Sequence, residues 1–189
     1  QLIEQSHYRQ RRQGIAEFNA RQSYLRRGLA LTPVKFGISF TATHLNQAGA
    51  LIHIYSDGSV HLNHGGTEMG QGLLTKVQQI VASAFGVSTA LVQVSATATD
   101  KVPNTSPTAA SSGTDLNAMA ALDAANQIKA RLIAFLAHGD VVGPGEFSDG
   151  KVRHVGVIWG WAELIQEAYL ERASLLGWRF SNTPPNHFK

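Results

Sequence analysis

The chain has 189 residues, 43% hydrophobic and 15% charged, so it can bury a core and intrinsic disorder is disfavoured. Its formal net charge is +3, and no apolar run approaches the roughly 18 residues of a membrane-spanning helix. The absence of cysteine excludes disulfides, iron–sulfur clusters and a cysteine nucleophile, and is compatible with the cytoplasm. Because the chain begins at Gln1 with neither Met nor a signal peptide, we expect a piece of something longer.

Residues 1–26 are predicted to form an N-terminal helical arm, because residues 2–25 lack proline and are rich in Gln, Arg, Glu and Ala. The arm and the residue after it carry most of the basic surplus, namely Arg9, Arg11, Arg12, Arg21, Arg26 and Arg27. Nucleic-acid binding is one interpretation. No aromatic residues interleave with the arginines as base stacking requires, so a solvated face, or a face that docks on an acidic partner, is favoured.

Residues 27–138 are predicted to form the α/β core. Its elements, in chain order, are a strand over 28–41 kinked near Gly37, a hairpin of strands 49–55 and 59–64, a helix over 71–85, a strand over 91–97 and a helix over 111–137. The hairpin prediction rests on Asp57-Gly58, a strong turn signal, and Gly86 is expected to end the first core helix.

Residues 139–189 are predicted to contribute a second hairpin around Ser148-Asp149-Gly150, a helix over 161–172, a strand over 173–180 and a tail, as part of a larger domain. Helices between strands require crossovers, so part of the sheet should be parallel. The fold class that follows is α+β, a two-layer sandwich of a mixed β-sheet and helices with a β-β-β-α-β-α core.

Two glycine- and serine-rich turns, residues 65–72 and 103–113, each run directly into a predicted helix. Such helix starts carry unpaired N–H groups that attract anions, and two of them suggest a split clamp around one large anionic ligand. A P-loop is disfavoured because no Lys follows Gly72 directly, and a dinucleotide fingerprint because Thr75 replaces its third glycine. The alternatives are an ordinary turn and an ordinary helix cap.

Other chemistry is weaker in the sequence. His53, His61 and His64 are candidate metal ligands, but no Asp or Glu completes a ligand set at a suitable spacing. Direct metal ligation by side chains is therefore disfavoured. Glu68 could be a catalytic base, although capping or anchoring of its own loop is favoured. Gln71 at the mouth of the first turn can donate and accept at once, which suits a heterocycle or an oxo group.

Several long segments resemble the xanthine dehydrogenase/oxidase family, and more narrowly the molybdenum-binding large subunit of the bacterial enzyme. They are Thr32–Phe40, Leu45–His53, the first glycine turn, Val102–Ser111, Ala168–Leu170 and Arg172–Leu175. The resemblance covers nearly the whole chain. It implies an oxidoreductase that hydroxylates purines, xanthine to urate, at molybdenum held by molybdopterin and not by protein side chains.

The resemblance also implies site residues. Gly70 and Gln71 would contact the pterin, Ala109 and Ala110 would face the metal and substrate, and Ser111 and Ser112 would contact the pterin or its phosphate. Many family members carry serine where this chain has Gly113, so only its backbone amide is expected to bind. The iron–sulfur clusters and FAD of the family lie on other modules.

The family's catalytic glutamate, in a Gly-Glu-Pro-Pro segment, and its Phe-Gly-Gly segment are absent from the chain. The resemblance therefore implies a cofactor-binding fragment with no catalytic residue, inactive alone. Its partners would be xanthine or hypoxanthine, the remaining large-subunit segments and the iron–sulfur/FAD subunit, in the cytoplasm, with no membrane or nucleic acid. An apolar surface left uncovered would favour a homo-oligomer. The alternative is a non-enzymatic domain that binds no cofactor in isolation.

Overall fold

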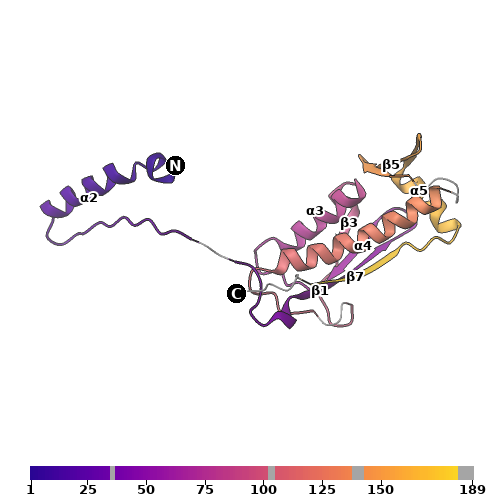
Figure 1. Cartoon of the computed structure of the whole chain (residues 1–189), viewed down its shortest axis with the longest axis horizontal. Helices are drawn as coiled ribbons and strands as arrows, with labels where there is room; N and C mark the ends of the chain where they lie inside the picture. The colour runs from indigo at the N-terminus through magenta and orange to yellow at the C-terminus, as the bar shows by residue number, and fades with distance from the viewer. Residues whose placement is uncertain (35–36, 102–104, 138–142, 183–189) are drawn as a thin grey trace. The chain divides into compact units, whose positions relative to one another are not determined.

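The computed structural model describes residues 1–34, 37–101, 105–137 and 143–182 (Figure 1). The chain divides into two units, Gln1–Phe36 and Gly37–Lys189, each considered by itself. The predicted boundaries at residues 26 and 138 stay predictions.

The N-terminal unit contains α1 (Leu2–Gln5) and α2 (Tyr8–Arg21), and no residue of either helix is buried. His7 adopts a left-handed conformation with φ 49°, which interrupts the single helix predicted here. Helix α2 ends where the Asn19 side chain bonds both the N–H and the carbonyl of Arg27, each at 2.9 Å. The Arg27 guanidinium lies 3.9 Å from the centroid of the Phe18 ring. The arm is thus helical as predicted, but its chain folds back after Arg21.

The second unit is built on a four-stranded sheet in the order β3-β2-β1-β7. Its strands are β1 (Gln47–Ile54), β2 (Val60–His64), β3 (Val92–Val94) and β7 (Leu176–Asn182). Strand β1 pairs antiparallel with β2 and β7, while β2 and β3 pair in parallel. The parallel pair exists because α3 (Leu73–Phe85) carries the chain back across the sheet. The predicted α+β class with a mixed sheet is confirmed.

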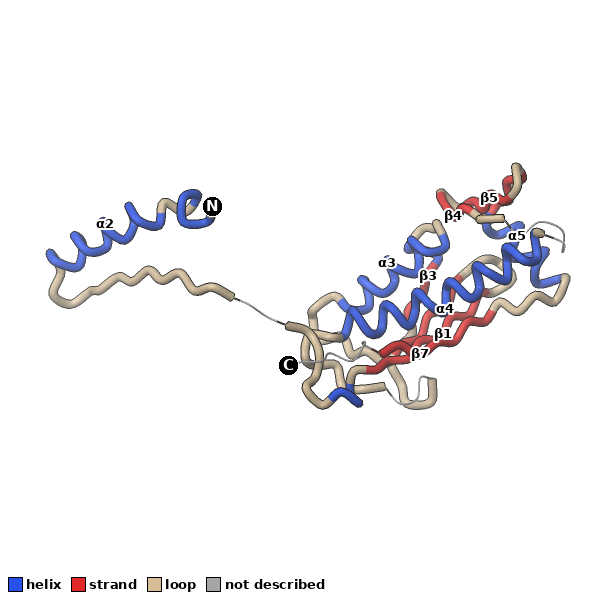
Figure 2. The backbone as a smooth tube through the Cα atoms, in the orientation of Figure 1, coloured by secondary structure: helices blue, strands red, loops and turns tan. Residues whose placement is uncertain are grey.

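Helices α3 and α4 (Gly113–Leu136) cover one face of this sheet (Figure 2). Alternate strand residues point into the layer between them, and Ile52 and Leu62 are fully buried there. Helix α4 approaches β7 closely at Gly177, where a Cβ atom would lie 2.4 Å from the Ala124 carbonyl oxygen. Glycine is therefore required at this position, because any side chain would meet helix backbone.

The opposite face of the sheet is open to solvent along the paired strands β1 and β7 in the described part of residues 37–189, whereas Asn63 of β2, on the same face, is buried. The open part carries Leu51, His53, Tyr55, Leu176 and Trp178, which we call the open sheet face. Trp178 lies opposite Leu51 and is 50% exposed, and Tyr55 is 52% exposed. Large apolar side chains thus gather on a solvent-facing surface.

A second, antiparallel sheet contains β4 (Glu146–Ser148), β5 (Lys151–His154) and β6 (Val157–Gly160). The hairpin predicted around Asp149-Gly150 is confirmed, whereas β6 was not predicted. Helix α5 (Trp161–Leu170) follows, and the buried Trp161 indole donates a 2.8 Å hydrogen bond to the Gly58 carbonyl. The chain then returns to the main sheet as β7, next to β1.

The strand predicted over 28–41 is absent from the described residues of that range, where Val34 is 85% exposed. Apolar alternation there was real, but no neighbouring strand pairs with the segment. Instead, the Ser39 N–H donates to the Ala110 carbonyl, and Asn46 bonds both the N–H and the carbonyl of Phe40 at 2.7 and 2.9 Å. Side-chain and loop hydrogen bonds replace a strand ladder.

Substitution of Gly177 tests the close packing of α4 on β7. We expect Gly177→Ala to lower the free energy of unfolding by about 1–3 kcal/mol, since the added methyl overlaps the Ala124 carbonyl. Gly143→Ala is the matched control, because its Cβ would meet only ordinary contacts of 3.6 Å or more. Urea denaturation of both variants gives the comparison, and equal stabilities would contradict the packing described.

Candidate functional site

The two glycine-rich turns lie side by side at one edge of the main sheet. The first turn, residues 65–72, directly follows β2, and the second turn, described over residues 105–113, comes after β3. Because β2 and β3 are parallel neighbours, their carboxyl ends meet at the same edge. The Thr67 N–H donates a 2.8 Å hydrogen bond to Thr108 Oγ1, which joins the turns directly.

Glu68 organises the first turn. Its carboxylate accepts hydrogen bonds from the N–H groups of Gly70, Gly72 and Leu74 at 2.8, 2.9 and 3.0 Å. The bonds from the backbone of Leu74 and Gly72 hold the pKa of the Glu68 carboxyl below its usual range. The anchoring interpretation is therefore confirmed. A carboxylate stabilised in this way at a helix start is a poor proton acceptor.

Gln71 is exposed at the mouth of the same turn, where its amide is held by the turn's own backbone. Its Oε1 accepts from the Met69 N–H at 2.6 Å, and its Nε2 donates to the Thr67 carbonyl at 2.9 Å. One amide hydrogen and one oxygen lone pair remain for a ligand. Gly70 has φ 95°, and nothing lies within 4 Å of where its Cβ would be, so the approach to the amide is open.

The second turn has an unusual backbone. Ala110 and Ser111 both adopt left-handed conformations, with φ 54° and 53°, which L-residues rarely do. Within the described part of the chain, the N–H groups of Ala109, Ala110, Ser111 and Gly113 have no acceptor. They form a set of free donors just before and at the start of α4, which suits an anionic or acceptor-rich ligand.

The serines of the second turn differ in their surroundings. Ser111 is exposed, whereas Ser112 is buried and its hydroxyl donates to the Ala109 carbonyl at 3.1 Å. Ser112 thus supports the turn from inside, and its hydroxyl is not presented to the solvent-facing donors. The structure brings the predicted residues of each turn to one edge of the sheet, but they offer a ligand mainly backbone N–H groups and the Gln71 amide.

A buried polar cluster lies behind the turns. His64, 2% exposed, accepts the Gly66 N–H on Nδ1 at 3.1 Å, and burial lowers the pKa of its imidazole. Within the described residues no partner is found for His64 Nε2, Asn117 Oδ1 or Thr105 Oγ1, all of them buried. His64 points to the helix-covered side of β2, away from His61 and His53. The described ranges contain no group of three His, Asp or Glu side chains that could hold a metal.

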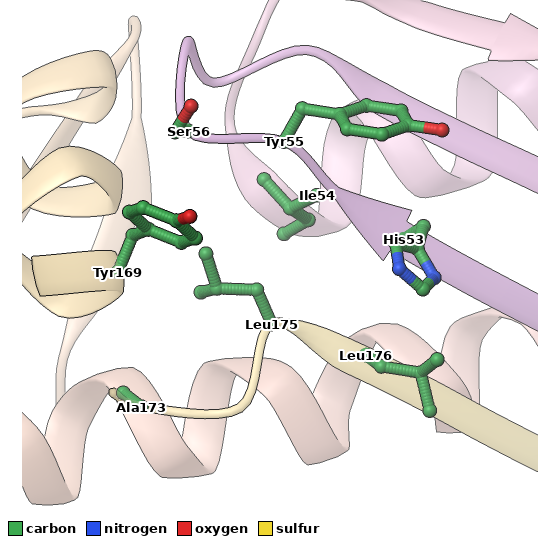
Figure 3. A pocket seen from close by; sticks show the side chains of 8 residues that line it. All are labelled: His53, Ile54, Tyr55, Ser56, Tyr169, Ala173, Leu175 and Leu176. Carbon is green, nitrogen blue, oxygen red and sulfur yellow. The ribbon is translucent and has the colours of Figure 1, made fainter.

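A separate pocket lies at the far end of the sheet, beside the β1–β2 turn and α5 (Figure 3). Apolar and aromatic side chains dominate its lining, which consists of His53, Ile54, Tyr55, Ser56, Tyr169, Ala173, Leu175 and Leu176. It adjoins the open sheet face and is remote from both turns in the strand register. Among the described helices, none is both long and apolar enough to cross a membrane.

Solved structures with a similar architecture include oxidoreductases, among them a Cu,Mo-CO dehydrogenase. The quinoline 2-oxidoreductase of Pseudomonas putida 86 superposes with a TM-score of 0.78 over 96% of this chain and 25% of its own, at 24% identity, which shows the fold alone. The CO dehydrogenase of Oligotropha carboxidovorans matches 74% of this chain and 18% of its own with a TM-score of 0.66 at 27% identity. The domain is thus of the kind found in this class of enzymes.

Residues 1–187 match the family model described as molybdopterin cofactor-binding domain, and the chain belongs to that family. It is 47% identical to xanthine dehydrogenase of Calliphora vicina over 96% of this chain, and 42% identical to xanthine dehydrogenase/oxidase of Felis catus over 97%. It spans only 12% of the length of each. The predicted resemblance to xanthine dehydrogenases is confirmed, while these eukaryotic relatives give the bacterial assignment no support.

The residues present fit such a cofactor. Pterin edges and phosphate oxygens are rich in hydrogen-bond acceptors, and the second turn presents four free backbone donors. Thr67, Thr108 and Asn117, which organise the turns, were not singled out as site residues from the sequence, and His64 was considered only as a metal ligand. The Thr67–Thr108 hydrogen bond and the contact of Asn117 with Gly66 join segments far apart in the chain, for which no local pattern exists.

The capping role of Glu68 can be tested by pH. Because its folded-state pKa is lowered, its stabilisation is complete above the ordinary glutamate pKa and is lost as the pH falls through the lowered value. We expect Glu68→Gln to weaken protection of the Gly70, Gly72 and Leu74 amides at neutral pH, and acid to do the same in the unmodified chain. Amide hydrogen exchange by NMR measures both.

The control for this experiment is Glu167→Gln, an exposed glutamate of α5. It should leave amide protection in the first turn unchanged. Equal protection in the Glu68 variant and the unmodified chain would show that the carboxylate does not cap the helix.

Proposed function

We propose that the two turns hold the molybdopterin cofactor of a purine hydroxylase of the xanthine dehydrogenase type, which converts xanthine to urate. The observation that carries the proposal is the row of free N–H groups at Ala109, Ala110, Ser111 and Gly113, beside the exposed Gln71 amide. The family match and the identity to xanthine dehydrogenases support it. As the chain spans an eighth or less of these relatives, the activity would belong to a larger polypeptide.

Each turn would contribute differently to binding. The second turn would donate backbone hydrogen bonds to phosphate and pterin oxygens, and the small side chains of Ala109 and Ala110 would leave room beside the metal and the purine. In the first turn, the remaining hydrogen and lone pair of the Gln71 amide would meet the pterin edge, with Gly70 allowing close approach. When bound, the cofactor supplies the redox-active molybdenum.

Proton transfer would come from outside residues 1–189. Glu68, the carboxylate nearest the turns in sequence, is committed to three backbone N–H groups. No Gly-Glu-Pro-Pro segment occurs in the chain. The chain alone would therefore not hydroxylate xanthine, and electrons would leave through the iron–sulfur and FAD modules of the larger cytoplasmic enzyme.

A second function has a specific observation in its favour. The Gln71 amide and the Glu68 carboxylate both make hydrogen bonds within their own turn, so the first turn is formed without a ligand. A domain that folds and associates without binding cofactor in isolation is compatible with this arrangement. Such a domain would still match the family.

The open sheet face is the proposed contact with the remaining large-subunit segments. At the start of the edge strand β7, Arg131 of α4 donates to the Ser174 and Leu176 carbonyls at 2.7 and 2.6 Å, so this end of the strand is less available for pairing. The exposed side chains of Trp178 and Tyr55 make the open sheet face an apolar surface of the kind that binds another protein segment. In the isolated chain this surface would drive homo-oligomerisation.

Cofactor binding is measured with the purified chain and released molybdopterin. We expect Gln71→Ala to raise the dissociation constant roughly 3- to 30-fold, the effect of one or two hydrogen bonds. Gln79→Ala, an exposed glutamine of α3, is the control and should bind normally. Full cofactor affinity in the Gln71→Ala variant would refute the role of the Gln71 amide. If the unmodified chain does not bind the cofactor, the second function is favoured. Urate formation by the cofactor-loaded chain would refute the proposal that the chain alone is inactive.

Self-association is tested at the open sheet face. We expect Trp178→Ser to shift the chain toward monomer in concentration-dependent light scattering, because it removes the largest exposed apolar side chain of the face. Met119→Ser is the control, since Met119 is 48% exposed on α4. A monomeric unmodified chain at high concentration would contradict the proposal.

A further inference from the structure

The two turns are joined by a set of contacts that we call the inter-turn seam. Its central element is the hydrogen bond from the Thr67 N–H to Thr108 Oγ1, at 2.8 Å and across 41 residues of sequence. Thr108 also packs on the start of α4, because its Cγ2 lies 3.3 Å from the position a Cβ would take on Gly113. One side chain thus contacts the backbone of the first turn and the helix start of the second.

Asn117 makes the second contact of the seam. Its Nδ2 donates to the Gly113 carbonyl at 2.7 Å and lies 3.0 Å from the position of a Cβ on Gly66. From the other side, Thr97 Oγ1 donates to the Gly66 carbonyl at 2.9 Å. Gly66 is thereby held between two segments, and a side chain there would overlap its neighbours.

Gly65 makes the third contact, against Thr105. A Cβ on Gly65 would lie 2.0 Å from Thr105 Oγ1, so the Thr105 side chain can pack here on the Gly65 backbone because Gly65 has no side chain. Gly70 and Gly72, in contrast, have nothing within 4 Å of their Cβ positions. The glycines of the first turn therefore divide into Gly65 and Gly66, which face the second turn, and Gly70 and Gly72, which leave space open.

We propose that the inter-turn seam sets the spacing between the Gln71 amide and the free N–H groups of the second turn before a ligand arrives, with Thr108 as its positioning residue. This inference rests on the function proposed above. Donors held at the correct separation bind without first being ordered, which lowers the entropic cost of binding. Thr67 is an exposed residue, so after loss of the Thr108 hydroxyl its N–H would bond to water, and the turns would loosen while the core stayed intact.

The test compares Thr108→Val, which keeps the shape and removes the acceptor, with Thr108→Ser, which keeps the acceptor. Thr75→Val on the exposed side of α3 is the matched control. Two readouts are taken on the purified chain: backbone ¹⁵N relaxation of residues 65–72 and 105–113 without ligand, and the dissociation constant for released molybdopterin. The urea unfolding midpoint is recorded for each variant.

We expect Thr108→Val to increase motion in both turns and to weaken cofactor binding roughly 2- to 10-fold, the effect of one hydrogen bond, at an unchanged unfolding midpoint. Thr108→Ser and Thr75→Val should behave like the unmodified chain. Unchanged relaxation in Thr108→Val overturns the inference, and so does weaker binding that Thr108→Ser fails to restore. If Thr108→Val unfolds, Thr108→Ala against Thr108→Ser gives the same comparison. If the unmodified chain does not bind, the proposed function fails, while the ligand-free relaxation still decides whether the seam orders the turns.

Discussion

The parallel pairing of β2 with β3 is the constraint on which the arrangement of this domain depends. It places Val60 opposite Val92 and Leu62 opposite Val94, and requires α3 to carry the chain back over one face of the sheet. The carboxyl ends of both strands then open at the same edge. Each strand is followed by a turn and a helix, so two helix starts lie together at that edge, where the Thr67–Thr108 hydrogen bond joins the turns.

The two turns solve the problem of unpaired backbone groups in opposite ways. In the first turn, Glu68 and Gln71 satisfy the N–H groups with side chains, which gives a defined loop in the absence of a ligand. In the second, Ala110 and Ser111 hold left-handed conformations that leave donors free. The ordered first turn therefore lies beside the free N–H groups of the second turn. Such pre-organisation is what a large ligand with many acceptors can exploit.

Local patterns predicted the elements whose signals lie within a few residues. Asp57-Gly58 marked the first hairpin, Gly86 ended α3 in the left-handed conformation, and Asp149-Gly150 marked the second hairpin. The strand over 28–41 failed because alternation alone does not supply a neighbouring strand. The long N-terminal helix failed at His7, whose left-handed backbone has no signature in composition.

Sequence was sufficient for the α+β class, the turn-to-helix junctions and the family resemblance, because each is written in contiguous residues. Two glycine turns could be recognised as a possible clamp, and Glu68 as its anchor. The separate tasks of Gly65-Gly66 and Gly70-Gly72, the coupling of Thr67 to Thr108 and the bare face around Trp178 emerged only from the folded chain. They are properties of distances between residues tens of positions apart, which depend on how strands pair and helices pack.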